Sequence, residues 1–187
     1  MSEITPAQAF LLTRRSRPYR SLSKPAPKRE QVEIMLQIAA RTPDHGKLEP
    51  WRFVVLEEKA LRRIAGIARD RAESIGQDPD KAAHAYEVTP FAVAVLESPK
   101  ESAKIPAIEQ TYSAGAVCLA LVNAALAGGW GANWLSGAVS HDAEFAAQAF
   151  GAEHHERVAG IIHIGKADAP GDRPRPDLNA KTTWMAE

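Results

Sequence analysis

The longest apolar stretch of the chain runs from residue 111 to residue 129, and it predicts a central helix. Alanine and leucine, both strong helix formers, dominate it, and small or apolar residues occupy every side of the helical projection, which is typical of a helix buried on all sides. Gly128 and Gly129 supply C-terminal positions where φ can be positive. The stretch falls short of the roughly 20 strongly hydrophobic residues of a membrane span and contains Asn123. We therefore expect a core helix, around which such a chain often dimerises.

Apolar residues three and four positions apart predict further amphipathic helices. Their limits in the sequence are 5–17, 28–41, 59–75 and 140–150. Thr5 and Gln8 form a capping-box pattern, and Ser140 is the expected N-cap of the last helix. In the second helix, Ile34 and Ile38 are expected to widen the buried face.

Short apolar runs predict the strands. They cover residues 51–56, 91–96, 130–135 and 158–165. The polar segment 76–87 is interpreted as a loop followed by a helical turn. Residues 166–187 are rich in Pro, Asp and Arg and are expected to form an extended C-terminal arm that lies on another surface, such as a second subunit. The chain should form one α+β or mixed α/β domain over residues 1–187, with helices on both faces of the sheet.

Composition narrows the classes of function. The 23 Lys and Arg residues balance the 23 Asp and Glu residues, so the formal net charge is zero. This balance argues against a general nucleic-acid or membrane-surface binder, because both need a basic surface. The single Cys118 cannot form an internal disulfide and is expected to be a small buried hydrophobe. The N-terminus lacks a signal-peptide pattern, so we expect a cytoplasmic location.

Three local clusters of residues are candidates for chemistry. They are Arg14-Arg15-Ser16, Arg41 with His45, and Trp134-Leu135-Ser136. Two guanidinium groups and a hydroxyl can hold a phosphate, an Arg and a His four apart in a turn can face one anion or heterocycle, and a Trp after a glycine turn can form a pocket wall. Each cluster also has an ordinary interpretation, namely solvated arginines at a helix end, a surface turn and a core tryptophan.

Several common chemistries lack their motifs. The chain has no GxSxG, HExxH, P-loop or GxGxxG motif. His154 and His155 are adjacent, so on a helix they would point apart, and no Cys or carboxylate cluster has metal-ligand spacing. We therefore expect no metal site and no Ser-His-Asp hydrolase.

The clusters occur in a characteristic order along the chain. RRS near the N-terminus is followed by a helix, by R-x-P-D-H-x-x-x-x-P-W, by the small-residue helix and by a W-x-S-G turn. No single piece is specific, but the ordered set spans residues 14–165. In this order the chain resembles the nitroreductase family of flavin enzymes, and in particular its compact members.

The resemblance implies an α+β fold in which a mixed sheet is flanked by helices. It also implies an intertwined homodimer with the central buried helix at the interface and two FMN sites between the subunits. The implied FMN contacts are Arg14, Arg15, Ser16, Trp134, Leu135 and Ser136 from one subunit, and Arg41 and His45 from the other. The first three would contact the phosphate, the ribityl chain and the pyrimidine side.

The chain departs from the family pattern at three places. Glu49 stands where most relatives have Gln, Lys47 where many have Asn, and Lys166 where many have Pro after the glycine that ends the last strand. Phosphate contacts from the C-terminal tail and the specificity of the substrate pocket therefore stay open at this point.

The resemblance implies an FMN-dependent oxidoreductase. It would take hydride from NADH or NADPH and reduce an electron-poor acceptor, such as a nitroaromatic, a quinone or an activated alkene. No side chain is assigned as catalytic, and His45 is the candidate for a proton or hydrogen-bond donor near the ring. A flavin-binding carrier or sensor without turnover, and a helical dimer without a ligand, are the alternatives.

Overall fold

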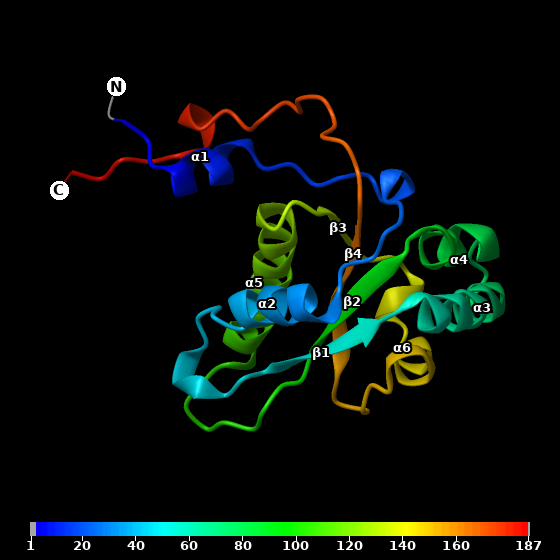
Figure 1. Ribbon diagram of the computed structural model, residues 1–187. Helices are drawn as coiled ribbons and strands as arrows, with labels where there is room; N and C mark the ends of the chain where they lie inside the picture. The colour runs from blue at the N-terminus through cyan, green and yellow to red at the C-terminus, as the bar shows by residue number, and fades with distance from the viewer. Residues whose placement is uncertain (1–2, 187) are drawn as a thin grey trace.

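The computed structural model describes residues 3–186, and its elements follow the predicted order (Figure 1). The helices are α1 (Pro6–Thr13), α2 (Arg29–Ala39), α3 (Glu58–Ser74), α4 (Pro79–Val88), α5 (Ala107–Ala127) and α6 (Ala143–Phe150). The strands are β1 (Trp51–Leu56), β2 (Phe91–Glu97), β3 (Gly131–Leu135) and β4 (Arg157–Gly165). Short 3-10 turns lie at Tyr19–Ser21, His45–Lys47, Val139–His141 and Asn179–Lys181.

The strands form an antiparallel sheet in the order β1-β2-β4-β3. β1 pairs with β2, β2 with β4, and β3 with β4, each time antiparallel. The expectation of a mixed sheet is therefore wrong for the described chain. β2 and β3, which flank α5 in the sequence, run in the same direction, but β4 lies between them and opposes both. α3 and α4 run out and back between β1 and β2, so these two neighbours are antiparallel as well.

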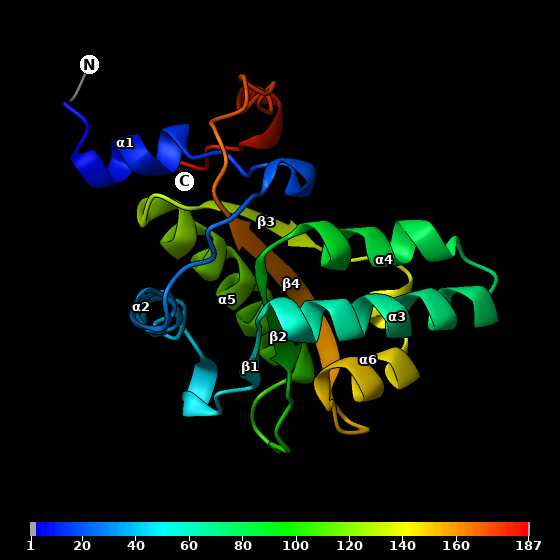
Figure 2. The same ribbon diagram turned by 45° about the vertical axis from the view of Figure 1, so that its right-hand side comes forward.

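Helices cover both faces of the sheet, as expected (Figures 1 and 2). α2 and α5 lie on one face, where their buried residues pack with Val93 and Ile162 of the strands. α3, α4 and α6 cover the other face, around Ala94 and Ile161. β2 is buried over its whole length because it lies between two strands and two helical layers. Apolar burial on both faces is the main source of stability.

α5 begins earlier than predicted, at Ala107. Cys118 and Leu121 are fully buried beside the sheet, and burial raises the pKa of the Cys118 thiol to about 12. The opposite face of the helix is uncovered, with Tyr112 67% and Leu119 47% exposed, so the prediction of burial on all sides is wrong for the single chain. α5 is long and apolar enough to cross a membrane, yet 50% of its most apolar window is buried inside the fold.

Two other helices leave apolar side chains uncovered. On α2, Ile34 is 57% and Ile38 45% exposed. Their predicted burial is wrong for the single chain, because the helix packs through Val32 and Met35. α1 buries no residue, and it projects from the body beside the C-terminal arm (Figures 1 and 2). Its Leu12 is 66% exposed, and apolar surface of this kind is typical of a face that another chain covers.

Capping chemistry decides where helices start. Thr5 and Gln8 form the predicted capping box, in which the Thr5 N–H donates to Gln8 Oε1 at 2.8 Å. α6 is capped by Asp142 and not by Ser140, which lies in the preceding 3-10 turn. The Asp142 carboxylate accepts a first-turn N–H at 2.9 Å. It also accepts two hydrogen bonds, of 2.8 and 2.7 Å, from Arg71, so a carboxylate suits this place better than a hydroxyl.

The segment predicted as a loop and a helical turn forms a complete helix, α4. Asp78 is its N-cap and accepts a hydrogen bond from the Lys81 N–H at 3.0 Å, and Pro79 occupies the first helical position. These two residues are a regular helix start signal. α4 packs through Ala83 and Tyr86 into the cluster that it shares with α3 and α6.

Two ionisable groups are buried at β4 and its start. Arg52 donates a 2.7 Å hydrogen bond to each carboxylate oxygen of Glu156, and these bonds lower the pKa of Glu156 to about 2. His163 is fully buried, and burial lowers its pKa to about 3. Its Nδ1 lies 2.8 Å from Thr89 Oγ1. Because the Thr89 hydroxyl donates to Ala85 O, Nδ1 carries the ring hydrogen and donates it to Thr89.

Because His163 is buried as a neutral ring, we expect the unfolding free energy to fall as the pH falls, and we expect His163→Gln to remove this part of the pH dependence. In the unfolded chain the imidazole has a pKa near 6.5, whereas the folded ring stays neutral down to about pH 3. The unfolded state therefore binds the extra proton in this window, and stability falls as the pH falls. Between pH 7 and pH 5, the wild-type protein should lose about 2 kcal/mol of unfolding free energy that the variant keeps, as measured by urea denaturation.

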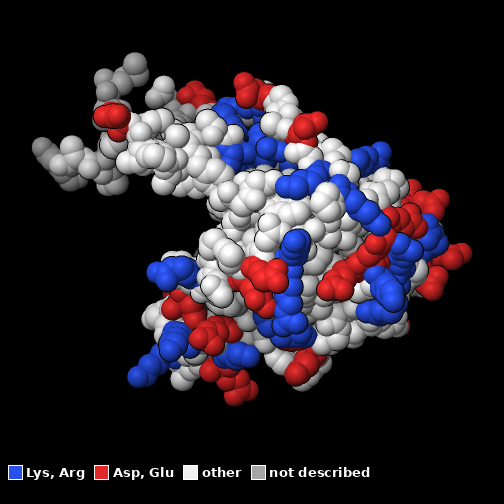
Figure 3. Space-filling view, viewed as in Figure 1, with Lys and Arg blue, Asp and Glu red and all other residues white. Residues whose placement is uncertain are grey.

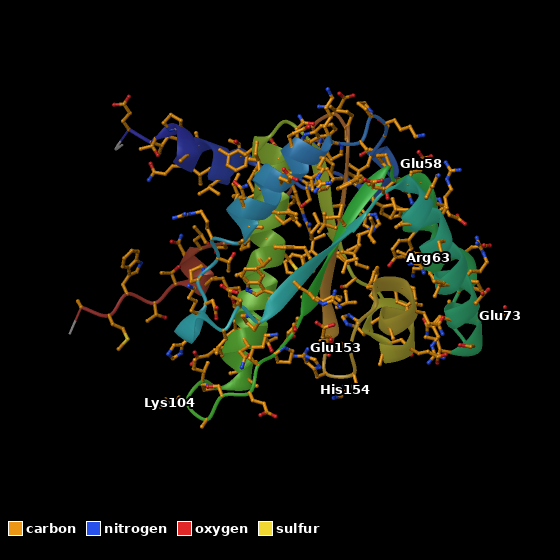
Figure 4. All side chains as sticks on the ribbon, turned by 60° about the horizontal axis from the view of Figure 1, so that its bottom comes forward. Glu58, Arg63, Glu73, Lys104, Glu153 and His154 are labelled. Carbon is orange, nitrogen blue, oxygen red and sulfur yellow. The ribbon has the colours of Figure 1, made fainter. Side chains whose placement is uncertain are left out.

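His154→Gln is the matched control for this experiment. His154 is exposed on the loop between α6 and β4 (Figure 4). Its substitution should leave the wild-type pH dependence in place. An unchanged pH dependence in His163→Gln would contradict the assignment of acid sensitivity to His163.

Candidate functional site

The segment after α1 lies against the beginning of β3. The Arg17 N–H donates to Ala132 O at 2.9 Å, and Asn133 Nδ2 donates to Arg17 O at 2.6 Å. Gly131 permits this approach, because a Cβ at this position would lie 3.1 Å from Arg17 Cγ. Arg14, Arg15 and Ser16 therefore lie close to the strand that leads to Trp134.

Four guanidinium groups gather here, and we call Arg14, Arg15, Arg17 and Arg175 the arginine cluster. The Nε atoms of the first three are buried and have no hydrogen-bond partner among the described residues. Burial, and then the positive charges of Arg175, Arg15 and Arg17, lower the pKa of Arg14. Arg14 Nη2 donates to Ser16 Oγ at 3.2 Å.

The arginine cluster lacks a counter-ion. Within residues 3–186, no Asp or Glu forms an ion pair with any of its four members. Figure 3 shows Lys and Arg side chains gathered at the top of the molecule, near the place where α1 and the C-terminal arm meet the body. Partly buried guanidinium groups without a carboxylate are suited to binding a phosphate.

A cavity of about 580 Å³ lies between α4 and the segment that follows β3. Leu135 and Ser136 line it, together with Tyr19, which follows the arginine segment in the chain. His163 and Tyr86 form a deeper part of the wall, and burial raises the pKa of the Tyr86 hydroxyl. Because His163 is neutral and its Nδ1 carries the hydrogen, its Nε2 is a hydrogen-bond acceptor. A mainly apolar cavity with a few polar groups is typical of small-molecule sites.

Trp134 does not line this cavity. Side chains alternate along a strand, so Trp134 and Leu135 face opposite sides of β3. The indole of Trp134 packs over Gly160 of β4, where any Cβ would overlap it, and 39% of the residue stays exposed. The arrangement combines both interpretations of this residue, since one side of the indole packs on the sheet while part of it remains accessible.

Arg41 and His45 lie at the other end of the molecule. His45 Nδ1 makes a 2.6 Å hydrogen bond with Glu109 Oε2, in the first turn of α5. The arginine cluster lies beside β3, which follows the last turn of α5. At 1.5 Å per residue, the 21 residues of α5 separate the two places by about 30 Å. One chain therefore places the arginine segment beside the start of β3, the strand that ends at Leu135, but does not bring Arg41 and His45 there.

Sequence reasoning missed three residues of this region. Arg17 is visible in the RRSR run, but only its contact with β3 reveals its place in the cluster. Glu109 fixes the ring of His45 and carries no sequence signal of its own. Arg175 lies in a tail whose composition predicts no packing, so nothing in the sequence connects it with Arg14.

Among residues 3–186, no group of three His, Cys, Asp or Glu side chains is placed to bind a metal.

Comparisons with known proteins show which family the chain resembles. A family model described as "Nitroreductase family" matches residues 11–166 of the chain. "Putative NAD(P)H nitroreductase YdjA" from Escherichia coli (strain K12) is 33% identical over 180 residues, which cover 95% of this chain and 92% of that protein. A Haemophilus influenzae protein named "Putative NAD(P)H nitroreductase" is 31% identical over 171 residues, which cover 89% of this chain and 91% of that protein.

Solved structures share the fold. The "Nitroreductase-like Family Protein from Bacillus cereus" superposes with a TM-score of 0.80 at 22% identity and covers 100% of both chains. A Desulfovibrio desulfuricans protein, described as a "putative nitroreductase in complex with fmn", gives a TM-score of 0.77 at 19% identity and covers 98% of both chains. The resemblance found in the sequence is thereby confirmed, and the chain belongs to the nitroreductase family.

Proposed function

We propose that this protein is an FMN-dependent oxidoreductase that takes hydride from NADH or NADPH and passes it to an electron-poor acceptor. A nitroaromatic, a quinone or an activated alkene has the required chemistry. The arginine cluster without a counter-ion is the observation that carries the proposal, because it fits the phosphate of FMN. Family membership and the FMN complex of the Desulfovibrio desulfuricans protein support the choice of flavin.

The two parts of the site in one chain match the two ends of the cofactor. Arg14, Arg15 and Ser16 would hold the phosphate through charge-assisted hydrogen bonds. Leu135, Ser136 and the cavity next to them would receive the flat ring, and Trp134 would complete the wall. Bound FMN supplies the redox chemistry, while the protein binds it, orients it and excludes water.

The position of Arg41 and His45 supports a homodimer. If two copies pack through the uncovered faces of α5 in antiparallel fashion around a two-fold axis, the His45 end of one helix meets the arginine end of the other. The exposed Tyr112 and Leu119 lie on that face. The apolar side of α1, which its own chain does not cover, and the C-terminal arm would then wrap the second copy.

His45 has a defined role in this proposal. Its Nδ1–H is directed to the Glu109 carboxylate, so Nε2 faces away from that carboxylate. The neutral ring can only accept a hydrogen bond at Nε2, and the charged ring can only donate one. His45 would therefore donate to the cofactor of the partner subunit only as an imidazolium.

The direct test of the proposal is flavin absorbance. Purified protein should be yellow or become yellow with FMN, NADH or NADPH should bleach it without oxygen, and an electron-poor acceptor should restore the colour. Bound FMN that neither nucleotide reduces would favour the carrier or sensor. Protein that takes up no FMN would favour the helical dimer without a ligand.

Arg14→Gln should weaken FMN binding about tenfold to a hundredfold, because one charge-assisted hydrogen bond to the phosphate is lost. Fluorescence titration of the apoprotein with FMN measures this change. Arg62→Gln is the control, since Arg62 is an exposed residue of α3 that pairs with Glu58. Equal affinities of the two variants would contradict the phosphate position.

Leu119→Asp should convert the dimer to a monomer and abolish FMN retention, because a charge on the uncovered α5 face cannot be buried against a second copy. Sedimentation velocity and the FMN content of the purified protein measure the two effects. Val88→Asp introduces the same charge at a 41% exposed position of α4 and should change neither. A Leu119→Asp variant that remains a dimer would argue against an α5 interface.

A further inference from the structure

The cavity between α4 and the segment after β3 has an exposed mouth and a buried floor. We call its buried lining residues the cavity floor, and they are Tyr86, Val139, Ser140, Ile161 and His163. The exposed lining residues form the mouth, among them Gln77, Asp78, Lys81, Ser136 and Gly137. The charged residues of the lining, Asp78 and Lys81, thus belong to the mouth, where water screens them.

His163 presents one ring nitrogen to this cavity. Its ring makes a single hydrogen bond with the described residues, from Nδ1 to Thr89 Oγ1 at 2.8 Å. Nε2 therefore has no partner within residues 3–186, yet it is not among the unpaired atoms that the fold encloses completely. Because His163 lines the cavity and only 1% of the residue is exposed, this nitrogen is the part of the ring that a ligand can reach.

The neighbours of His163 fix its tautomer. Thr89 Oγ1 donates its own hydrogen to Ala85 O at 2.7 Å, so this hydroxyl can only accept a hydrogen bond from the ring. Nδ1 carries the ring hydrogen as a consequence, and Nε2 presents a bare lone pair. Burial also keeps the ring uncharged, because it lowers the pKa of His163 to about 3. The cavity floor thus holds a neutral acceptor that needs a donor from its ligand.

The surroundings of this acceptor suit a flat ligand. The Tyr86 ring lies 5.6 Å from the His163 ring at an angle of 58°. The Tyr86 hydroxyl interacts with the Ser140 side chain, so these two groups have a partner in each other. On α4, the small side chains of Ala82 and Ala85 line the opposite wall. An aromatic ring with one neutral donor fits this floor better than a sugar or a phosphate, whose many polar or charged groups would stay unpaired there.

We propose that the cavity floor selects the electron-poor acceptor of the reaction, because Nε2 of His163 accepts a hydrogen bond from a neutral O–H or N–H group of that substrate. The inference rests on the proposed function, in which the flavin ring lies at Leu135 and Ser136. The reducible group of the substrate then points to the mouth and its donor group to the floor. The substrate class is a neutral aromatic acceptor with a hydroxyl or amino group remote from the reducible group.

A matched pair of ligands tests the need for a donor. The compound para-nitrobenzyl alcohol has the O–H group, whereas its methyl ether keeps the oxygen without the hydrogen. The ether would displace water from Nε2 without replacing its hydrogen bond and would leave a buried acceptor unpaired. The alcohol should therefore bind the purified protein about tenfold more tightly, as measured by calorimetry, and its kcat/KM with NADH or NADPH should exceed that of the ether by a similar factor.

The imidazole nitrogen resonances provide a readout that does not depend on turnover. In ¹⁵N-labelled protein, the alcohol should shift the Nε2 resonance of His163 upfield, because an unprotonated nitrogen becomes more shielded when it accepts a hydrogen bond. The ether should not produce this shift. His154 is exposed and should keep its resonances with either ligand, so it serves as the internal reference.

His163→Phe keeps a flat ring in the cavity floor and removes the acceptor nitrogen, so this variant should bind the alcohol and the ether equally. His154→Phe makes the same substitution at an exposed position and should keep the tenfold preference for the alcohol. The resonance measurement on the wild-type protein tests the same contact without a substitution, so it does not depend on how the variant folds.

Equal binding of the alcohol and the ether by the wild-type protein would overturn the inference. A bound alcohol that leaves Nε2 of His163 unshifted, or a preference that survives in His163→Phe, would do the same. FMN that is bleached by NADH and recovers equally with both compounds in those cases would leave the proposed function intact. Protein that takes up no FMN would remove the proposed function and the role of the ligand as acceptor, even if the alcohol binds at the cavity floor.

Discussion

The length of α5 is the constraint on which the rest of the site depends. One side of this helix packs on the sheet, and its two ends carry different chemistry, with His45 and Glu109 at one end and the arginine cluster beside β3 near the other. A rigid helix of this length cannot bring its own ends together. In the proposed dimer, a second copy packed in antiparallel orientation on the uncovered face would place unlike ends side by side. In the proposed dimer, the same helix is core, interface and spacer.

Electrostatics distinguishes the arginine cluster from arginines elsewhere in the fold, which pair with buried or partly buried carboxylates. Arg52 binds Glu156, Arg71 binds Asp142, and Arg157 binds the buried Glu97 through a 2.6 Å hydrogen bond. The net charge of the chain is zero, so a group of unpaired cations in one place leaves an excess of acidic groups elsewhere. The imbalance is local, and composition alone could not reveal it. A ligand with two negative charges would offset part of the positive charge that the fold leaves unpaired at the arginine cluster.

The sequence predicted the order of the elements well, because periodicity and capping residues act locally. The α4 helix was missed, since its polar composition obscured the start signal of Asp78 and Pro79. The prediction that Ser140 caps the last helix is wrong for a tertiary reason, because Arg71 binds Asp142 and this carboxylate caps the helix instead. Strand direction and the exposure of Ile34 depend on packing between distant segments, which periodicity does not report. For the site, the RRS motif was visible, but the approach of Arg175 to Arg14 joins the two ends of the chain without any pattern that connects them.

The lack of internal support for α1 has a consequence for biogenesis. A newly synthesised chain that has folded its sheet and core helices still leaves α1 and residues 171–186 without a surface that buries them. In the proposed dimer, these segments acquire their contacts only when two polypeptides meet, so maturation would follow second-order kinetics. At low expression, dimers would form slowly, so the coenzyme would bind well after translation. As the concentration of subunits rises, both dimer formation and coenzyme binding would become faster. Dilution of the purified dimer below its dissociation constant would release the coenzyme and remove the contacts of both terminal segments in one cooperative step.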